Sequence, residues 1–166
     1  MTIRRATPTD ARAIAEVHVA TWRGAYAHVF PAQVLDSLSV DEREQLWRQS
    51  AEDDSIGIFV AEKERGIVGF VSVGESRDVP GEGELYAIYV HPDEWGSGAG
   101  TALMKAGRDW LEQRYPTAIL WVLADNPRAR RFYEREGWVA DGERTDVLRG
   151  IEVAEVRYRL SGLDRR

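Results

Sequence analysis

A glycine-rich turn between a strand pattern and a helix pattern, near the middle of the chain, gives the framework for the whole fold. The turn is Trp95-Gly-Ser-Gly-Ala-Gly100. Residues 84–91 before it are apolar and β-branched, as in a strand, and residues 101–111 after it carry apolar side chains at helical spacing. A helix start offers free backbone N–H groups and a dipole that favours negative charge, and glycine has no Cβ to block an anion. The junction therefore predicts a site for a phosphate-bearing ligand.

The rest of the chain continues this alternation of strand and helix patterns without a linker or a repeat. The expected order is β-α-α-β-β-β-α-β-α-β-β, which predicts an α/β fold with one mixed, mostly antiparallel sheet and helices on both faces. The 166 residues are the length of one ordinary domain, so we expect a single domain over residues 1–166. The predicted elements are strand 3–6, helix 7–22, one or two helices within 31–50, strands 56–62, 66–73 and 84–90, helix 101–111, strand 117–123, helix 126–136, and strands 138–140 and 152–160.

Composition and charge exclude several classes of protein. The chain has no cysteine, which excludes disulfides, thiolate metal ligands and a cysteine nucleophile, and which fits a cytoplasmic location. Its three histidines show no metal-ligand spacing, so we expect no metal. The net charge of −6 argues against nucleic acid as a partner. No apolar run approaches the ~20 residues that span a bilayer, and no signal peptide is visible, so we expect no membrane partner.

Two familiar phosphate-binding motifs do not fit the glycine turn. A dinucleotide site needs Gly-x-Gly-x-x-Gly after the first strand of a βαβ unit, whereas here Leu103 stands in the place of the third glycine and the turn lies in mid-chain. A P-loop needs a lysine between glycine and Ser/Thr, and Gly100 is followed directly by Thr101. Another kind of phosphate-bearing ligand is therefore expected.

Two segments resemble the GNAT superfamily of N-acetyltransferases. They are residues 89–103, which contain the glycine turn, and Asn126-Pro-Arg-Ala-Arg-Arg-Phe-Tyr-Glu-Arg-Glu-Gly-Trp138. The superfamily loop is usually Gln/Arg-x-x-Gly-x-Gly/Ala; Gly98 and Gly100 match its glycines, and Trp95 stands where Gln or Arg is expected. The resemblance covers nearly the whole chain and implies a GNAT-like fold with acetyl-coenzyme A as co-substrate.

The resemblance and the physics of the turn agree on where this co-substrate binds. The pyrophosphate is expected on the backbone amides at the helix start. The extended pantetheine arm is expected along the edge of the preceding strand, because the resemblance implies that this strand splays from strand 117–123. The side chains of Ile88 and Val90 can pack in the core while their backbones bind. The predicted cofactor-binding residues here are Ile88, Tyr89, Val90, Trp95, Gly96, Ser97, Gly98, Ala99, Gly100 and Thr101.

Asn126 and Tyr133 each have two interpretations. Asn126 is placed to cap the helix that begins at Pro127, and the resemblance adds a carboxamide contact to the cofactor arm. Tyr133 lies two helical turns further on the same face, where it can pack in the core. The resemblance instead makes its phenol the general acid that protonates the departing thiolate. The unperturbed pKa of a phenol is ~10 and that of a thiol ~8.5, so this transfer is chemically sound.

The implied reaction is direct acyl transfer from a thioester to an amine, which needs a base or a water path. Glu84, at the start of the cofactor strand, is the first candidate, with an exposed acid at a strand end as the alternative. His28, Glu75 and Tyr86 are weaker candidates for the base. Trp22 and Tyr26, clustered with Arg23 and Phe30, are candidates for acceptor binding, although such aromatic clusters more often belong to a core.

The acceptor is expected to be a small-molecule amine or a protein amine, with the acidic net charge favouring a cationic one. A catalytically inactive acyl-coenzyme A binding or sensing module on the same fold is the alternative function. Exposed edges of the last strands allow a homodimer, as they do in many monomers.

Overall fold

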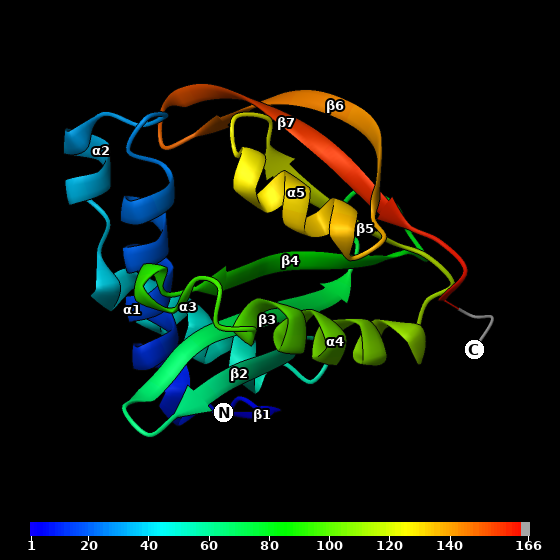
Figure 1. Ribbon diagram of the computed structural model, residues 1–166, viewed down its shortest axis with the longest axis horizontal. Coiled ribbons are helices and arrows are strands. Elements are labelled where there is room, and N and C mark those ends of the chain that lie inside the picture. The colour runs from blue at the N-terminus through cyan, green and yellow to red at the C-terminus, as the bar shows by residue number, and fades with distance from the viewer. Residues whose placement is uncertain (164–166) are drawn as a thin grey trace.

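In residues 1–163, which the computed structural model describes, seven strands form one sheet (Figure 1). The strand order is β1-β2-β3-β4-β5-β7-β6, and every neighbouring pair is antiparallel except β4 with β5. The expected α/β fold with a mixed, mostly antiparallel sheet is confirmed. The elements are β1 (Thr2–Arg5), the 3-10 turn η1 (Pro8–Asp10), α1 (Ala11–Ala25), α2 (Ala32–Asp36), α3 (Val40–Glu52), β2 (Gly57–Lys63), β3 (Gly66–Glu75), β4 (Gly83–Val90), η2 (Pro92–Glu94), α4 (Ala99–Glu112), β5 (Ala118–Leu123), α5 (Pro127–Arg135), β6 (Val139–Leu148) and β7 (Ile151–Leu160).

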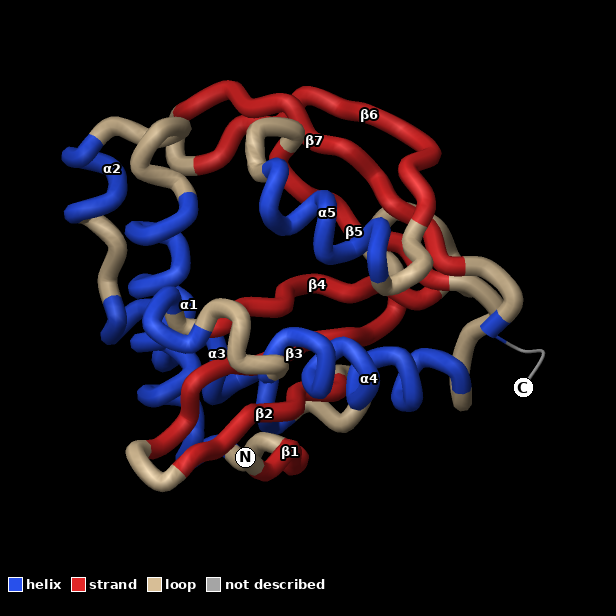
Figure 2. The backbone as a smooth tube through the Cα atoms, in the orientation of Figure 1, coloured by secondary structure: helices blue, strands red, loops and turns tan. Residues whose placement is uncertain are grey.

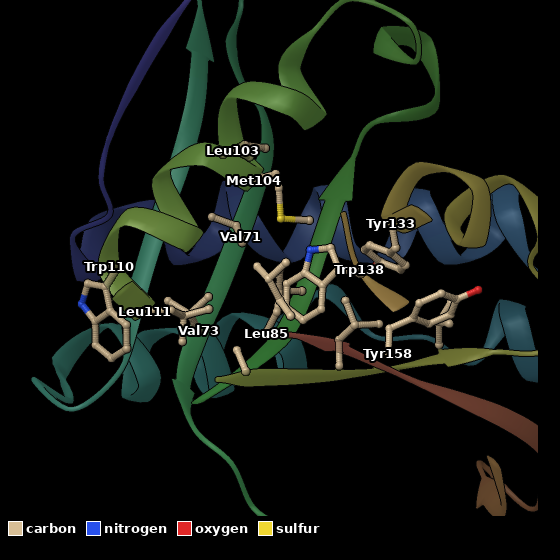
Figure 3. Close-up of a cluster of buried hydrophobic side chains, with 14 of the residues drawn as sticks. Val71, Val73, Leu85, Leu103, Met104, Trp110, Leu111, Tyr133, Trp138 and Tyr158 are labelled. Atoms are coloured by element: carbon tan, nitrogen blue, oxygen red, sulfur yellow. The ribbon is translucent and has the colours of Figure 1, made fainter. Parts of the chain in front are cut away.

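Helices cover both faces of the sheet, and strand alternation decides which side chains meet which helix. Val71 and Val73 of β3 belong to a core cluster with Leu103 and Leu111 of α4. Phe70 directly precedes Val71 and so points to the other face of the sheet, where it belongs to a different cluster with side chains of α1. Figure 3 shows the first cluster, to which Tyr133, Trp138 and Tyr158 from the C-terminal half also contribute. Helices α4 and α5 therefore share one face of the sheet, and α1 lies on the other.

Strands β4 and β5 touch only at their beginnings. Their parallel pairing is limited to Gly83 with Ala118 and Glu84 with Ile119. Directly afterwards the register between β3 and β4 shifts, so that Tyr86 is an extra residue on β4. Such a bulge bends the strand that carries it, and beyond it β4 diverges from β5, as Figure 2 shows. The predicted splaying of these two strands is confirmed.

Between β1 and β2 the structure has three α-helices, so it has two of the one or two helices expected within 31–50. The segment 31–50 contains both α2 and α3. Ser39 separates them, because its hydroxyl accepts a hydrogen bond from the N–H of Glu42 (3.2 Å) and so starts a new helix. The first of the two helices is only one turn long.

Strand β6 is much longer than the predicted strand 138–140. The prediction also included Trp138, which precedes β6 in the structure. The additional residues are mostly polar and show no apolar alternation. They are held instead by pairing with β7 and by ion pairs between the strands, such as Arg157 with Asp141 (2.7 Å) and Arg144 with Glu155 (2.8 Å). An edge strand of this kind has no hydrophobic signature in the sequence.

Helix α4 begins at Ala99, two residues before the predicted start, so the last glycine of the turn lies inside its first turn. Its buried face includes Met104 and Gly107, whereas Ala102 and Ala106 are only half-buried. Gly107 leaves room for Val71 and Val73 of the sheet. Among residues 1–163, no helix combines the length and the apolar character needed to cross a membrane.

Candidate functional site

A cavity of about 910 Å³ lies where β4 and β5 separate. This volume is within the range of small-ligand pockets, ~300–1,000 Å³. Its walls come from α1, α3, β4, β5, the start of α5 and the end of β6. The predicted site residues that line it are Trp22, Tyr26, Glu84, Ile88, Tyr89, Trp95, Asn126 and Tyr133. The structure thus brings together the side chains that the sequence assigned to catalysis and to acceptor binding, whereas Val90 and residues 96–101 lie outside this lining.

The edge of β4 that β5 leaves is a backbone edge available to a ligand. The N–H of His91 donates to the carbonyl of Val68 in β3 (2.8 Å). Successive residues of a strand direct their backbone groups to alternate edges, so Ile88 and Val90 face the side away from β3. This geometry suits an extended ligand with amide groups, as the sequence predicts.

Trp95 occupies part of this edge. Its indole N–H donates to the carbonyl of Val90 (2.8 Å), and the hydroxyl of Thr21 donates to the same oxygen (3.3 Å). The residue that departs from the superfamily loop pattern therefore fastens the glycine turn to the end of β4. Because the carbonyl of Val90 is already paired, Ile88 is the residue whose N–H and C=O remain directed to the cavity side.

The glycine turn has the conformation that an anion site requires. Gly96 and Gly98 have φ values of 82° and 90°, and a Cβ added at either position would meet nothing within 4 Å. Glycine is thus needed at both positions for the backbone conformation, and the space in front of them is open to a ligand. The first amides of α4 have no partner within the helix. The N–H of Ala99 donates to the hydroxyl of Ser97, which precedes the helix (3.4 Å).

One arginine of α5 lies against this turn with two more near it in charge, Arg131 and Arg135, and the sequence analysis did not assign them a role. The guanidinium of Arg128 lies 3.9 Å from the ring centre of Trp95. Burial lowers the pKa of Arg128, and the charges of Arg135 and Arg131 lower it further. In the described part of the chain none of the three has a carboxylate partner. Helix α5 approaches the start of α4 through Phe132, whose ring is 3.5 Å from a Cβ built on Gly100. The sequence signal for this positive charge was the run of arginines after Pro127.

Asn126 caps α5, as one of its two interpretations states. Its Oδ1 accepts a hydrogen bond from the N–H of Ala129 (3.2 Å), and its Nδ2 donates to the hydroxyl of Tyr26 (3.4 Å). The carboxamide thereby ties the end of β5 to α1 across the cavity. The predicted contact with a cofactor arm stays a prediction.

Tyr133 belongs both to the core and to the cavity. Its ring packs near those of Phe132 and Tyr158, and the residue is 7% exposed. Its hydroxyl makes no hydrogen bond within residues 1–163. Burial raises the pKa of Tyr133 well above that of a free phenol, and the nearby Tyr89 raises it further. The hydroxyl is therefore protonated at neutral pH, and in a residue that lines the cavity it can serve as a donor.

Glu84 is 1% exposed, so the alternative of an exposed acid at a strand end is wrong. Its carboxylate accepts hydrogen bonds from the backbone N–H of Arg77 (3.1 Å) and from the guanidinium of the same residue (2.7 Å). Of the weaker candidates for the base, His28 is bonded through Nε2 to the carbonyl of Asp125 (2.8 Å), and Tyr86 donates to the carbonyl of Glu75. Glu84 lines the cavity with an arginine partner already in place.

The aromatic cluster expected near the acceptor is both core and cavity wall. Trp22 stacks on Phe30 with ring centres 5.3 Å apart and meets Tyr26 edge-on at 5.0 Å. The indole N–H of Trp22 donates to the hydroxyl of Tyr89 (3.2 Å), which links α1 to β4. Burial raises the pKa of Tyr26 and of Tyr89, so both phenols stay neutral.

Comparison with known proteins shows which family this chain resembles. The model of the acetyltransferase (GNAT) family matches residues 16–138. The chain is 35% identical over 160 residues to the uncharacterized N-acetyltransferase YuaI from Bacillus subtilis, covering 94% of this chain and 90% of that protein.

Solved structures agree on the fold. A ribosomal-protein-alanine N-acetyltransferase from Brucella melitensis is similar with a TM-score of 0.76 and 21% identity, over 97% of this chain and 99% of that one. The putative acetyltransferase yncA from Salmonella typhimurium, solved with its cofactor acetyl-CoA, is similar with a TM-score of 0.75 and 22% identity, over 99% and 95% of the two chains.

Proposed function

Because the chain belongs to the acetyltransferase (GNAT) family of acyltransferases, we propose that it transfers an acetyl group from acetyl-coenzyme A to a primary amine by direct attack. One observation carries this proposal: the open edge of β4 and the hydroxyl of Tyr133 face one cavity, beside a glycine turn at a helix start. The alternative, a catalytically inactive acyl-coenzyme A binding module, gives no reason for an unpaired phenol at that place.

The residues at the turn fit a pyrophosphate. The open space before Gly96 and Gly98, the free amides of α4 and the three arginines of α5 supply donors and positive charge together. The pantetheine arm is proposed to pair with Ile88 on the free edge of β4, with the carboxamide of Asn126 on its other side. The similar protein yncA, whose structure was solved with its cofactor acetyl-CoA, supports this co-substrate.

The proposed transfer needs one proton donor and one proton acceptor. The amine nitrogen attacks the thioester carbonyl carbon, so that a C–N bond forms and the C–S bond breaks. Tyr133 donates its hydroxyl proton to the departing sulfur, and the amine loses a proton to a base. A positioned general acid contributes typically ~10²–10⁴-fold to a rate. Glu84 is the proposed base, with its carboxylate oriented by Arg77.

Calorimetric titration of the purified protein with acetyl-coenzyme A tests the first step, with NAD as a control that shares the adenine and pyrophosphate groups. Saturable binding at about micromolar concentration, absent for NAD, is the expected result. No binding up to millimolar concentrations would remove the basis of the proposal. Binding without release of free coenzyme A in the presence of any amine from a broad set would instead favour the binding module.

A further inference from the structure

The cavity contains a second charged region, on the side of α1 and α3. Arg43 of α3 and Arg149 of the β6–β7 turn both line it. Each lowers the pKa of His18 on α1 through its charge, and Arg149 also lowers that of Arg43, so the three side chains lie near one another. They come from three separate parts of the sequence, and only the tertiary fold brings them together.

Neither arginine of this pair has an anionic partner among residues 1–163. The Nε of Arg43 is buried and makes no hydrogen bond. Burial is the first cause that lowers the pKa of Arg43. A desolvated guanidinium with an unpaired N–H is costly, and a second cation nearby adds to the cost. The two arginines are therefore arranged to receive an anion from a bound ligand.

Apart from Arg128 beside the glycine turn, the other arginines that line the cavity have ion-pair partners. Arg77 pairs with Glu84 (2.7 Å). Arg144 pairs with Glu155 (2.8 Å) and lies within ion-pair distance of two aspartates, Asp78 (3.4 Å) and Asp146 (3.7 Å). No lining carboxylate is therefore left to serve Arg43 or Arg149.

His18 does not supply an acid or a base to this region at neutral pH. Its Nδ1 accepts a hydrogen bond from the indole of Trp47 (3.1 Å), which leaves Nε2 as the protonated nitrogen. Burial lowers the pKa of His18 to about 3, and the charges of Arg43 and Arg149 lower it further. At neutral pH it is a neutral donor beside two cations, which again suits an oxyanion.

The pair is separate from the predicted pyrophosphate site. The glycine turn begins α4, which packs on the face of the sheet that carries Val71 and Val73. His18, beside the pair, lies within ring contact of Phe70, on the opposite face. The arginine pair therefore lies toward the opposite face of the sheet from the proposed phosphate site, which leaves it available to the acceptor.

We propose that the acceptor amine is a small molecule that carries an anionic group, a carboxylate or a phosphate, which Arg43 and Arg149 bind. This inference rests on the proposed acetyl transfer. It reverses the expectation from net charge, because the local charge of the acceptor side is positive while the molecule as a whole is negative. Because Arg43 and Arg149 line a cavity, an anion that binds both has to enter it, which favours a small molecule over a protein surface.

Matched acceptors test the charge. The L-amino acids are compared with their amides, and phosphoethanolamine with ethanolamine, so that each pair differs in its anionic group and the two series separate carboxylate from phosphate. We expect kcat/KM to be at least tenfold higher for the anionic member of one series, as two charge-assisted hydrogen bonds allow. Equal values in both series, with acetyl-coenzyme A turned over, would overturn the inference and leave the proposed function intact. Failure to bind acetyl-coenzyme A would instead defeat the proposed function.

Variants of the pair locate the effect. Arg43→Met and Arg149→Asn, the latter because asparagine tolerates the φ of 50° at this turn, should reduce the preference for the anionic member to nearly one. Arg48→Met is the control, since this arginine of α3 is exposed and pairs with Glu44. A preference that survives in Arg43→Met, or an acetyl-coenzyme A affinity that falls with it, would contradict the assignment.

A binding measurement does not depend on finding the acceptor. Acetate and inorganic phosphate are titrated into the three purified proteins, wild type, Arg48→Met and Arg43→Met, while thermal unfolding is followed. We expect one of the two anions to raise the melting temperature of the first two proteins more than that of the third. Equal shifts in all three for both anions would show that Arg43 binds neither.

Discussion

At the scale of single residues, Tyr133 is where the two interpretations of the chain differ most. A tyrosine that only packs needs its ring, whereas a general acid needs its hydroxyl, and Tyr133→Phe removes the hydroxyl alone. We expect the single-turnover rate of acetyl transfer to fall ~10²–10⁴-fold with an unchanged affinity for acetyl-coenzyme A, measured by calorimetry. The free hydroxyl supports this, because no hydrogen bond in the described chain is lost. A rate within twofold of wild type would show that Tyr133 is not the acid.

Gly98 tests the turn, and Gly81 provides a matched control. Both have left-handed φ values, 90° and 85°, and a Cβ at either would meet nothing within 4 Å. Gly98→Ala and Gly81→Ala should therefore each lose ~1–2 kcal/mol of unfolding free energy from backbone strain. Only Gly98→Ala should also weaken binding of acetyl-coenzyme A, because its methyl group lies in the space proposed for the pyrophosphate. Equal affinities in the two variants would place the pyrophosphate elsewhere.

At the scale of elements, α5 contributes more than its tyrosine. Arg131→Gln removes one of the unpaired charges beside the glycine turn, and we expect the Kd for acetyl-coenzyme A to rise about three- to tenfold at low salt. The effect should shrink in ~0.5 M salt, because screening weakens such interactions. Arg12→Gln is the control: it removes the same charge from an exposed arginine that pairs with Asp41 and Glu44 across α1 and α3. A salt-independent loss, or an equal loss in the control, would exclude a direct charge effect.

The elements that the sequence predicted well are those with a local signal. Glycine, proline and periodic apolar residues predict four of them: the strand before the turn, the turn itself, and the helices at 99–112 and 127–135. Strand β6 has no such signal, since it is held by ion pairs with β7 and by the Arg149-Gly150 turn. The role of Trp95 was equally out of reach, because its bond to Val90 depends on where β4 ends.

At the scale of the whole molecule, charge is distributed unevenly between surface and cavity. The net charge of −6 favours a cationic acceptor, but it sums the charges of the whole chain and does not say where they lie. Arg43 and Arg149 are more than 100 positions apart in the sequence and meet only when α3 and the β6–β7 turn are both in place. The sequence therefore sufficed for the fold and for the elements around the glycine turn, whereas the approach of Arg43 to Arg149 required the tertiary arrangement.

Ion pairs also make the stability of the whole molecule depend on pH. Asp10 joins the first helical turn to the sheet edge, because its carboxylate accepts two hydrogen bonds from Arg4 (2.8 and 2.9 Å), and Arg4 also pairs with Glu62 of β2. The hydrogen bond from Arg4 is the first cause that lowers the pKa of Asp10, and the N–H of Thr7 lowers it further. An acid with a lower pKa in the folded state stabilises that state above its unfolded pKa of ~3.9, and the stabilisation is lost as the pH falls through the folded pKa.

Asp10→Asn should therefore lower the unfolding free energy by ~1–2 kcal/mol at pH 7, and the difference from wild type should diminish steadily below about pH 4. Asp36→Asn is the control, since Asp36 is exposed and has no ion pair among residues 1–163. Urea unfolding at a series of pH values from 7 to 3 measures both variants. A difference between Asp10→Asn and wild type that stays constant over this range would mean that the side chain acts through its shape and its hydrogen bond to Thr7, and that its charge contributes nothing to holding β1 and α1 together.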